Sequence, residues 1–146
     1  MHVGERRAQE VITIAADESA QAVASLMRKE HVGDVVVVED GRKPVGIVTD
    51  RDLVLEVMAP RLDPADLVAR EIASSPLFTV GAQDELFAAM EIMETKGVRR
   101  VPVVQADGSL LGLLTVDDVW ELLAGLETQL AGVVNRQRKE ERRRRS

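Results

Sequence analysis

Gly46-Ile47-Val48-Thr49-Asp50-Arg51-Asp52 and Gly112-Leu113-Leu114-Thr115-Val116-Asp117-Asp118 are two copies of one pattern. In each copy, a glycine and two apolar residues lead into a threonine, and an aspartate follows three residues later. The copies lie 66 positions apart, and placing residues 12–58 over 78–124 without a gap gives 11 identities in 47 positions. Unrelated sequences of ordinary composition would give about three. The chain therefore contains an internal repeat.

The two repeats share one order of predicted elements: strand, helix, strand, strand, helix. In the first repeat we expect strands at 11–14, 35–38 and 45–48, a helix to about residue 30 capped by Asp17 or Ser19, and a helix opening near Thr49. In the second we expect extended segments at 77–80, 101–104 and 110–114, a helix over 84–96 ended by Gly97, and a longer helix from Val116. This predicts a mixed α/β (α+β) fold of two β-α-β-β-α repeats with pseudo-two-fold symmetry, in which small sheets pack on helices.

A repeat of this length is near the lower limit for burying a core alone, so we expect the two repeats to pack on each other. The predicted division is 5–58 for the first repeat, 59–76 for a linker with a short helix, 77–127 for the second repeat, and 128–146 for a helical extension with a basic tail. In the linker, Pro60 ends the preceding helix, and Pro64 lies in the first turn of the short helix, which Asp63 caps.

The composition of the chain excludes several kinds of site and argues against several functions. The chain has no cysteine, which excludes disulfides and thiolate metal sites, and it has neither a membrane-spanning apolar run nor a secretory signal, so a cytoplasmic location is expected. The net charge of -6 divides into +5 for residues 136–146 and therefore -11 for the remainder, which argues against a nucleic-acid platform on the fold itself. The tail is expected to be too charged to pack, and to be frayed or disordered. No metal-ligand spacing and no motif of an activated nucleophile is present, so we expect no enzyme.

The repeated stretch has two possible uses. A strand that ends at a helix start presents free backbone amides, Thr49 offers a hydroxyl, and an ionised Asp52 suits the paired hydroxyls of a ribose. Gly46 lets a flat ligand approach the backbone, and Arg51 has the forked geometry that suits phosphate. Thr-x-x-Asp is equally a near-capping box that only starts a helix. Capping does not explain the glycine, which favours ligand binding.

The duplication, the element order and both stretches, VGIVTDRDLV and LGLLTVDDVW, resemble a pair of CBS domains (a Bateman module), over roughly residues 5 to 127. The segment GVRRVPVV is also similar to that family. The resemblance implies that adenine nucleotides or related adenosyl ligands bind in clefts between the repeats. It implies that the ribose is contacted by Thr49 and Asp52 in one cleft and by Thr115 and Asp118 in the other. It implies adenine contacts at Ile12, Thr13, Phe78 and Thr79. It implies phosphate contacts at Arg99 and Arg100. With Gly46, Arg51 and Gly112, these are the candidate site residues.

The two candidate sites differ in charge, because Arg51 corresponds to Asp117. A carboxylate near a phosphate is repulsive, so a charged nucleotide is expected at the Arg51 site. For Arg99 and Arg100, a solvated strand end or an ion pair with the acidic body is as well supported as phosphate contact.

We expect a stand-alone regulatory module that binds AMP, ADP or ATP as a regulatory ligand, needs no cofactor, and signals in trans to a protein partner. A homodimer is expected, with Leu126, Leu130 and Val133 of the last helix against a second copy; the alternative for these residues is packing on the linker helix of the same chain. Two alternatives stay open: a structural or interaction module with empty clefts, and attachment of the basic tail to nucleic acid.

Overall fold

The computed structural model describes residues 1–6 and 11–146 and consists of two compact units, Met1–Leu114 and Thr115–Ser146. Among the described residues, no helix combines the length and the apolar character needed to cross a membrane.

The first repeat folds in the predicted order. Its elements are β1 (Thr13–Ala15), α1 (Ala20–Glu30), β2 (Asp34–Glu39), β3 (Lys43–Thr49) and α2 (Asp50–Leu53), which continues as the π-helical turn η2 (Val54–Met58). The sheet order is β1-β2-β3, with β2 parallel to β1 and antiparallel to β3. Ser19, one of the two predicted caps, accepts a hydrogen bond from the amide of Ala22 at 3.0 Å and so begins α1.

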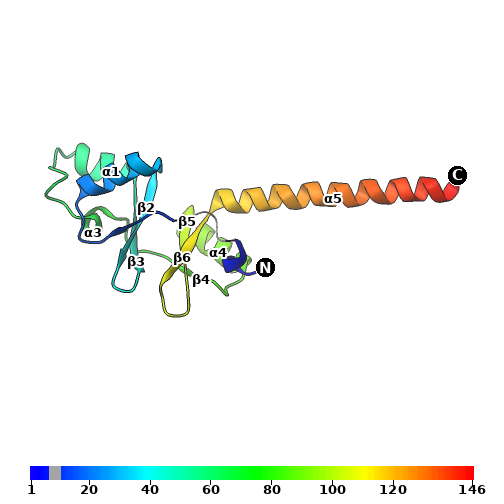
Figure 1. Cartoon of the computed structure of the whole chain (residues 1–146), viewed down its shortest axis with the longest axis horizontal. Helices are drawn as coiled ribbons and strands as arrows, with labels where there is room; N and C mark the ends of the chain where they lie inside the picture. Colours follow the sequence, from blue (N-terminus) through cyan, green and yellow to red (C-terminus); the bar gives the residue numbers. More distant parts are fainter. Residues whose placement is uncertain (7–10) are drawn as a thin grey trace. The chain divides into compact units, whose positions relative to one another are not determined.

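The second repeat has the same order of elements. They are β4 (Val80–Gly81), α4 (Leu86–Lys96), β5 (Arg100–Val104), β6 (Leu110–Thr115) and α5 (Val116–Arg145), with sheet order β4-β5-β6. Helix α4 begins after the predicted Asp84, because the Asp84 carboxylate accepts the amide of Gly81 at 2.7 Å and closes a turn there. Gly97 ends α4 in the left-handed conformation, with φ 65°, as predicted. The two small sheets and their helices, drawn in Figure 1, confirm the mixed α/β fold.

Each repeat is completed by a segment from outside its own sequence range. These segments contain the short helices η1 (Val3–Arg6) and α3 (Ala69–Ile72). The amide of Ala69 donates to the carbonyl of Glu18 at 2.7 Å, and the amide of Val3 donates to the carbonyl of Asp84 at 2.9 Å. The two donors, Val3 and Ala69, are 66 positions apart, and so are the two acceptors, Glu18 and Asp84. The N-terminal segment therefore bonds to the second repeat in the same way as the linker bonds to the first. Figure 1 shows the N-terminus beside β4 and α4.

The linker differs from the prediction in the position of its helix. Pro64 begins a turn rather than a helix, because Asp63 Oδ1 accepts the amide of Ala65 at 2.9 Å. The helix comes later, at α3, where Glu71 Oε1 accepts the amide of Val68 at 3.2 Å. Prediction of a proline-started helix at this point was therefore wrong.

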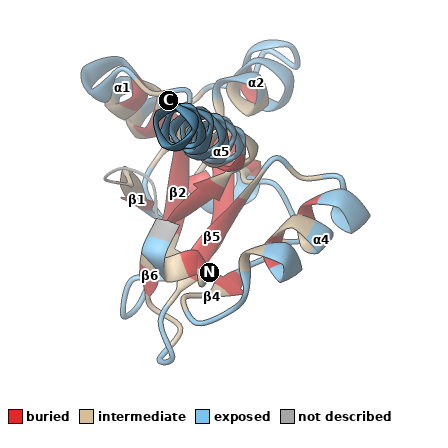
Figure 2. Ribbon diagram, turned by 90° about the vertical axis from the view of Figure 1, so that its right-hand side faces the viewer, coloured by how far each residue is buried: buried red, intermediate tan, exposed pale blue. Residues whose placement is uncertain are grey.

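The valines of the central strands form the core. Val35, Val36 and Val37 of β2 and Val101 and Val103 of β5 are at most 1% exposed. Figure 2 shows burial concentrated on these two strands. Uninterrupted apolar runs fit strands that are covered on both faces.

The two repeats meet in a separate apolar cluster. It contains the buried side chains of Val36, Ile47, Leu110 and Leu113. Ile47 and Leu113 occupy equivalent positions of the two repeats, so the contact is made about the pseudo-two-fold axis. This agrees with the expectation that neither repeat buries enough apolar surface alone.

Helix α5 continues to Arg145, so the prediction that the basic tail is frayed or disordered was wrong. Arginine and glutamate are good helix formers, and the tail contains neither glycine nor proline. Arg136 Nε lies 3.5 Å from Glu140 Oε1, one turn further along, and four arginines in the last turn face the negative end of the helix dipole. The prediction considered only packing and left out these local contributions.

Candidate functional site

Both copies of the repeated pattern form the same hydrogen-bonded junction. The amide of Thr49 donates to Asp52 Oδ2 at 2.8 Å, and the amide of Asp52 donates to Thr49 Oγ1 at 3.1 Å. Thr115 and Asp118 exchange the same two bonds at 2.8 and 3.2 Å. Each pair is a capping box that starts a helix, so the capping alternative for this pattern is observed in both repeats.

The cap leaves part of each carboxylate unused. A carboxylate has two oxygens with about four acceptor sites, and the cap of the first junction uses only Asp52 Oδ2. Within the described part of the chain, Asp52 Oδ1 makes no hydrogen bond, and the residue is half-buried. The same holds for Asp118. Capping a helix and binding a ligand are therefore compatible at these positions.

The first junction lies at one end of the sheet β1-β2-β3. Thr49, the last residue of β3, pairs with Asp34, the first residue of β2. On the other side of β2, Thr13 pairs with Val36, and the carbonyl of Ile12 accepts the amide of Val36 at 3.0 Å. The sheet therefore brings the predicted adenine-binding stretch and the predicted ribose-binding junction to the same end.

The positively charged side chain of Arg51 lies beside this junction. Arg51 is exposed, and among the described residues its guanidinium has no ion-pair partner. Its amide donates to Asp50 Oδ1 at 2.8 Å, and the amide of Asp50 donates to the carbonyl of Gly33 at 2.9 Å. The backbone around Arg51 is thus fixed while its side chain is open to an anion.

Gly46 has a packing reason that the sequence did not reveal. A Cβ built at this position would lie 2.6 Å from Ala73 Cβ, far inside a normal carbon contact of about 3.5–4.0 Å. Both the amide and the hydroxyl of Ser74 donate to the carbonyl of Ile47 at 3.0 Å and hold the linker against β3. The glycine is therefore explained without a ligand, and a ligand contact at Gly46 stays a prediction.

The two predicted adenine contacts of the second repeat, Phe78 and Thr79, lie just before β4. Phe78 is half-buried, with the ammonium of Lys96 5.3 Å from the centroid of its ring, and Thr79 is exposed. A cation at this distance over an aromatic face is attracted to it. Part of the Phe78 ring is therefore already in contact with a side chain of the same protein.

Arg100 forms an ion pair with an acidic residue of the body, one of the roles expected for it. Its Nε lies 3.3 Å from Oδ2 of Asp34, its equivalent in the first repeat. That distance fits an ion pair, but the angles do not give a hydrogen bond, and the buried Nε has none. Arg99 beside it is exposed. Phosphate contact by either arginine stays a prediction.

The candidate residues are divided between the two units. Gly112 is buried in β6 and, like Phe78, Thr79, Arg99 and Arg100, belongs to the first unit, whereas Thr115 and Asp118 belong to the second. The first predicted site, around Thr49 and Asp52, therefore lies within one unit, whereas the residues of the second are described in two units.

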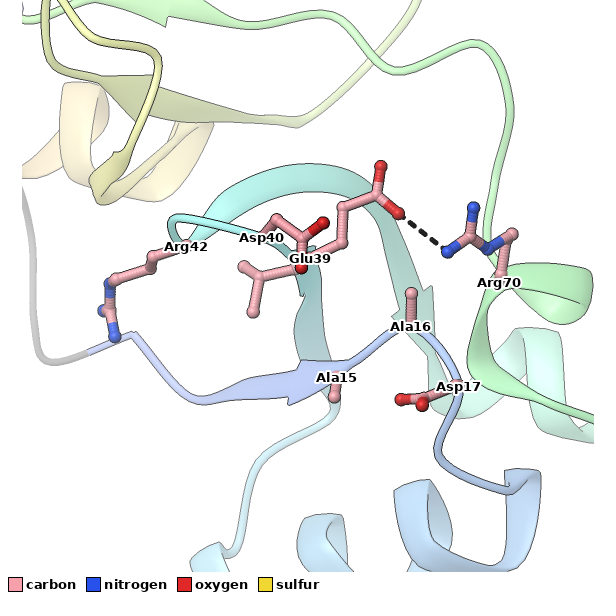
Figure 3. Close-up of a pocket in the computed structure, with 8 residues that line it drawn as sticks. Ala15, Ala16, Asp17, Glu39, Asp40, Arg42 and Arg70 are labelled. Atoms are coloured by element: carbon pink, nitrogen blue, oxygen red, sulfur yellow. Dashed lines mark hydrogen bonds and ion pairs between the residues drawn. The ribbon is translucent and has the colours of Figure 1, made fainter.

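A pocket that sequence reasoning missed opens elsewhere in the first repeat. Its volume is about 560 Å³, and it is lined by Ala15, Ala16, Asp17, Val38, Glu39, Asp40, Arg42 and Arg70. Figure 3 shows these side chains and the contact between Arg70 and Glu39, whose Nη2 and Oε2 lie 2.7 Å apart. It contains none of the predicted site residues. Nothing in the sequence brings Arg70 next to Glu39.

A second, mostly apolar pocket of about 400 Å³ lies between α1 and η2. It is lined by Ala20, Gln21, Ala24, Leu53, Val57, Met58, Arg61, Leu62 and Pro64. Met58 and Leu62 at this pocket are 72% and 48% exposed.

Comparison with known proteins supports the resemblance that the two stretches suggested. The CBS domain family model matches residues 5–59 and 69–123. An uncharacterized protein of Methanopyrus kandleri is 37% identical over 132 residues, which cover 88% of this chain and 67% of that protein. Hypoxic response protein 1 of Mycobacterium tuberculosis is 32% identical over 109 residues, 75% of this chain and 76% of that protein.

A solved structure supports the same conclusion. The CBS domain protein from Pyrobaculum aerophilum complexed with AMP is 32% identical, with a TM-score of 0.70 over 81% of this chain and 89% of that chain. The likeness extends over both repeats, since it includes most of each chain.

Proposed function

The chain belongs to the CBS-domain family, and we propose that it is a regulatory module, not an enzyme, that binds an adenine nucleotide such as AMP, ADP or ATP. The observation that carries the proposal is the junction at Thr49 and Asp52, where the cap leaves Asp52 Oδ1 unbonded among the described residues. The relative from Pyrobaculum aerophilum that is complexed with AMP supports this class of ligand.

The ligand contacts follow from the chemistry of the junction. The two hydroxyls of a ribose are donors, and Asp52 Oδ1 is the open acceptor at this position. Ile12 and Thr13, at the same end of the sheet, would contact the adenine. The exposed guanidinium of Arg51 would bind the phosphate with paired N–H donors.

A charged nucleotide should prefer the first junction. Asp117 stands at the position equivalent to Arg51 and carries the opposite charge. At about 4 Å, two like unit charges repel by about 1 kcal/mol in water and about 4 kcal/mol near a protein surface. The second junction would therefore bind an uncharged adenosyl group better than a nucleotide phosphate.

We propose that the protein acts as a homodimer and that a protein partner reads its state in trans. Large apolar side chains on the repeats' helices support a partner surface: Val54, Leu55, Met58 and Phe87 are between 48% and 82% exposed. We also propose that the domain boundaries lie where the sequence predicts them and that the protein is cytoplasmic.

Thermal shift with AMP, ADP, ATP, NAD and S-adenosylmethionine is the first test. A ligand that binds only the folded state raises the melting temperature as its concentration exceeds the dissociation constant. AMP, ADP or ATP should give a saturable rise. If none of the five ligands changes the melting temperature, the protein is better explained as a structural module whose threonines and aspartates only cap helices.

Titration calorimetry then locates the site. Asp52→Ala should weaken AMP binding by about tenfold or more, because it removes the open acceptor for a charge-assisted hydrogen bond. Asp118→Ala is the matched control, since it loses the same capping bonds in the other repeat. Equal affinities for AMP in wild type and Asp52→Ala would contradict the proposed site.

Nucleic-acid attachment through the basic end of α5 is the weaker alternative. A gel-shift assay with DNA or RNA at two salt concentrations, on full-length protein and on a chain ending at residue 135, would detect it.

A further inference from the structure

Helix α5 carries an apolar stripe of large, exposed side chains. Leu123, Leu126, Leu130 and Val133 are 48%, 44%, 66% and 61% exposed. They follow each other at intervals of three, four and three residues, which is the spacing of the core positions of a two-stranded coiled coil. Val119, one step earlier in the same spacing, is only 7% exposed, so the open part of the stripe begins at Leu123.

The helix also contains residues that weaken it when it stands alone. Gly125 and Gly132 lie within α5, and a Cβ at either position would meet no atom within 4 Å. Each glycine in an exposed helix interior costs about 1 kcal/mol relative to alanine. A partner on the apolar stripe would offset this cost and remove the exposed leucines from water.

The two halves of α5 have opposite charge. Residues 116–131 contain Asp117, Asp118, Glu121 and Glu127 and no basic residue, which gives -4. Residues 132–146 contain seven basic and two acidic residues, which gives +5. A helix with this division is complementary to a second copy of itself that runs in the opposite direction.

We propose that α5 pairs with α5 of a second copy of the chain as an antiparallel two-stranded coiled coil. This proposal rests on the homodimer of the proposed function and assigns it a surface and a direction, outside the nucleotide site. The open stripe from Leu123 to Val133 has its midpoint at residue 128, and centring the pair there aligns the exposed apolar residues. Leu126 then packs on the partner's Leu130, and Leu123 packs on the partner's Val133.

The charges on the two halves of α5 favour the antiparallel direction of the paired helices. In the antiparallel pair centred at residue 128, Arg136, Arg138 and Lys139 of each helix run along the start of the other, which carries Asp117 and Asp118. The repulsion it introduces is between the two Glu127 side chains, which flank the seam opposite each other. A parallel pair would place two +5 segments side by side and gain one attraction, from Arg136 to the partner's Glu141. The stronger term is the repulsion between the two basic segments, which is not offset by a single exposed pair.

Disulfide cross-linking of the full chain distinguishes these arrangements, because the protein has no cysteine of its own. In the antiparallel pair, Gln129 flanks the seam at the midpoint and faces the partner's Gln129. Gln129→Cys should therefore oxidise to a covalent dimer. Thr128→Cys, on the outer face of the helix, and Leu126→Cys, whose two copies meet only in a parallel coil, should stay monomeric on a denaturing gel.

A second set of variants ties the cross-link to the stripe. In the Gln129→Cys background, Leu126→Ala with Leu130→Ala should weaken pairing by about a hundredfold, because four leucine side chains leave the seam of each dimer. Thr128→Ala with Asn135→Ala, on the outer face, should leave the cross-link yield unchanged. The AMP-induced melting shift should be the same in all these variants, which separates this proposal from the nucleotide site.

Each other result overturns the proposal. A disulfide dimer of Leu126→Cys would show a parallel coil. No disulfide in Gln129→Cys, or equal yields with and without the leucines, would show that the stripe does not pair with a second copy.

Discussion

Replacing Gly46 by alanine tests the packing between the linker and the sheet of the first repeat. The new Cβ would lie 2.6 Å from Ala73 Cβ, about 1 Å inside a normal carbon contact. Ala73 is not free to retreat, because the amide and hydroxyl of Ser74 next to it both donate to the carbonyl of Ile47 at 3.0 Å. The clash must therefore be relieved by displacing the linker or the strand.

The expected magnitude is the difference between two terms. Overpacking of this kind costs about 1–3 kcal/mol, and Gly46 does not have a positive φ, so alanine also gains about 0.4–1 kcal/mol by restricting the unfolded chain. Gly46→Ala should lower the free energy of unfolding by about 1–2 kcal/mol. In a chain that already carries Ala73→Gly the clash is absent, so the same substitution should cost nothing or stabilise slightly.

Urea unfolding of the wild type, both single variants and the double variant measures this coupling. Gly125→Ala, at a position with no atom within 4 Å, serves as a control that should not destabilise. An equal loss from Gly46→Ala in both backgrounds would refute the assigned contact. If Gly46→Ala is as stable as wild type and loses only nucleotide affinity, the glycine serves a ligand and the packing explanation fails.

Three further predictions concern other parts of the molecule. Arg51→Ala should weaken AMP binding by about tenfold and leave adenosine binding unchanged in calorimetry, because only the phosphate contact is removed. Val3→Ala should lower the unfolding free energy by roughly 2 kcal/mol in urea, since Val3 is fully buried and lies in the segment that completes the second repeat. The Ser109 hydroxyl, followed by the Ser109 amide, holds the pKa of Asp107 below its ordinary value. The stability that this carboxylate contributes is therefore present above its unfolded-state pKa and is lost as pH falls through the lowered one, and Ser109→Ala should raise the pKa in an NMR titration.

Most of the fold could be predicted from the offset between the two repeats. Once Thr49 and Thr115 were aligned, the valine runs fell on equivalent strands, and short β-branched runs between turn residues have few alternatives to buried strands. The strand, helix, strand, strand, helix order followed from that alignment. The capping box was also foreseeable, because it requires only a threonine and an aspartate at this spacing and its hydrogen bonds are local.

The features that sequence did not provide are contacts between distant residues with no periodic signal. The N-terminal segment and the segment around Ala69 bond to equivalent places in the two repeats, yet their sequences show little similarity. Gly46 and Ala73 are separated by α2, η2, the linker turn and α3, so their close approach became visible only with the fold. The pocket at Arg70 was missed for the same reason.

Amide NMR of the protein titrated with AMP tests the central claim most directly. We predict that the amide shifts concentrate at Ile12, Thr13 and the residues from Thr49 to Asp52, and that Asp52→Ala abolishes them at the same AMP concentration. Shifts that centre on Asp17 and Arg42 instead, or no shifts at millimolar AMP, would contradict nucleotide binding at the strand-to-helix junction.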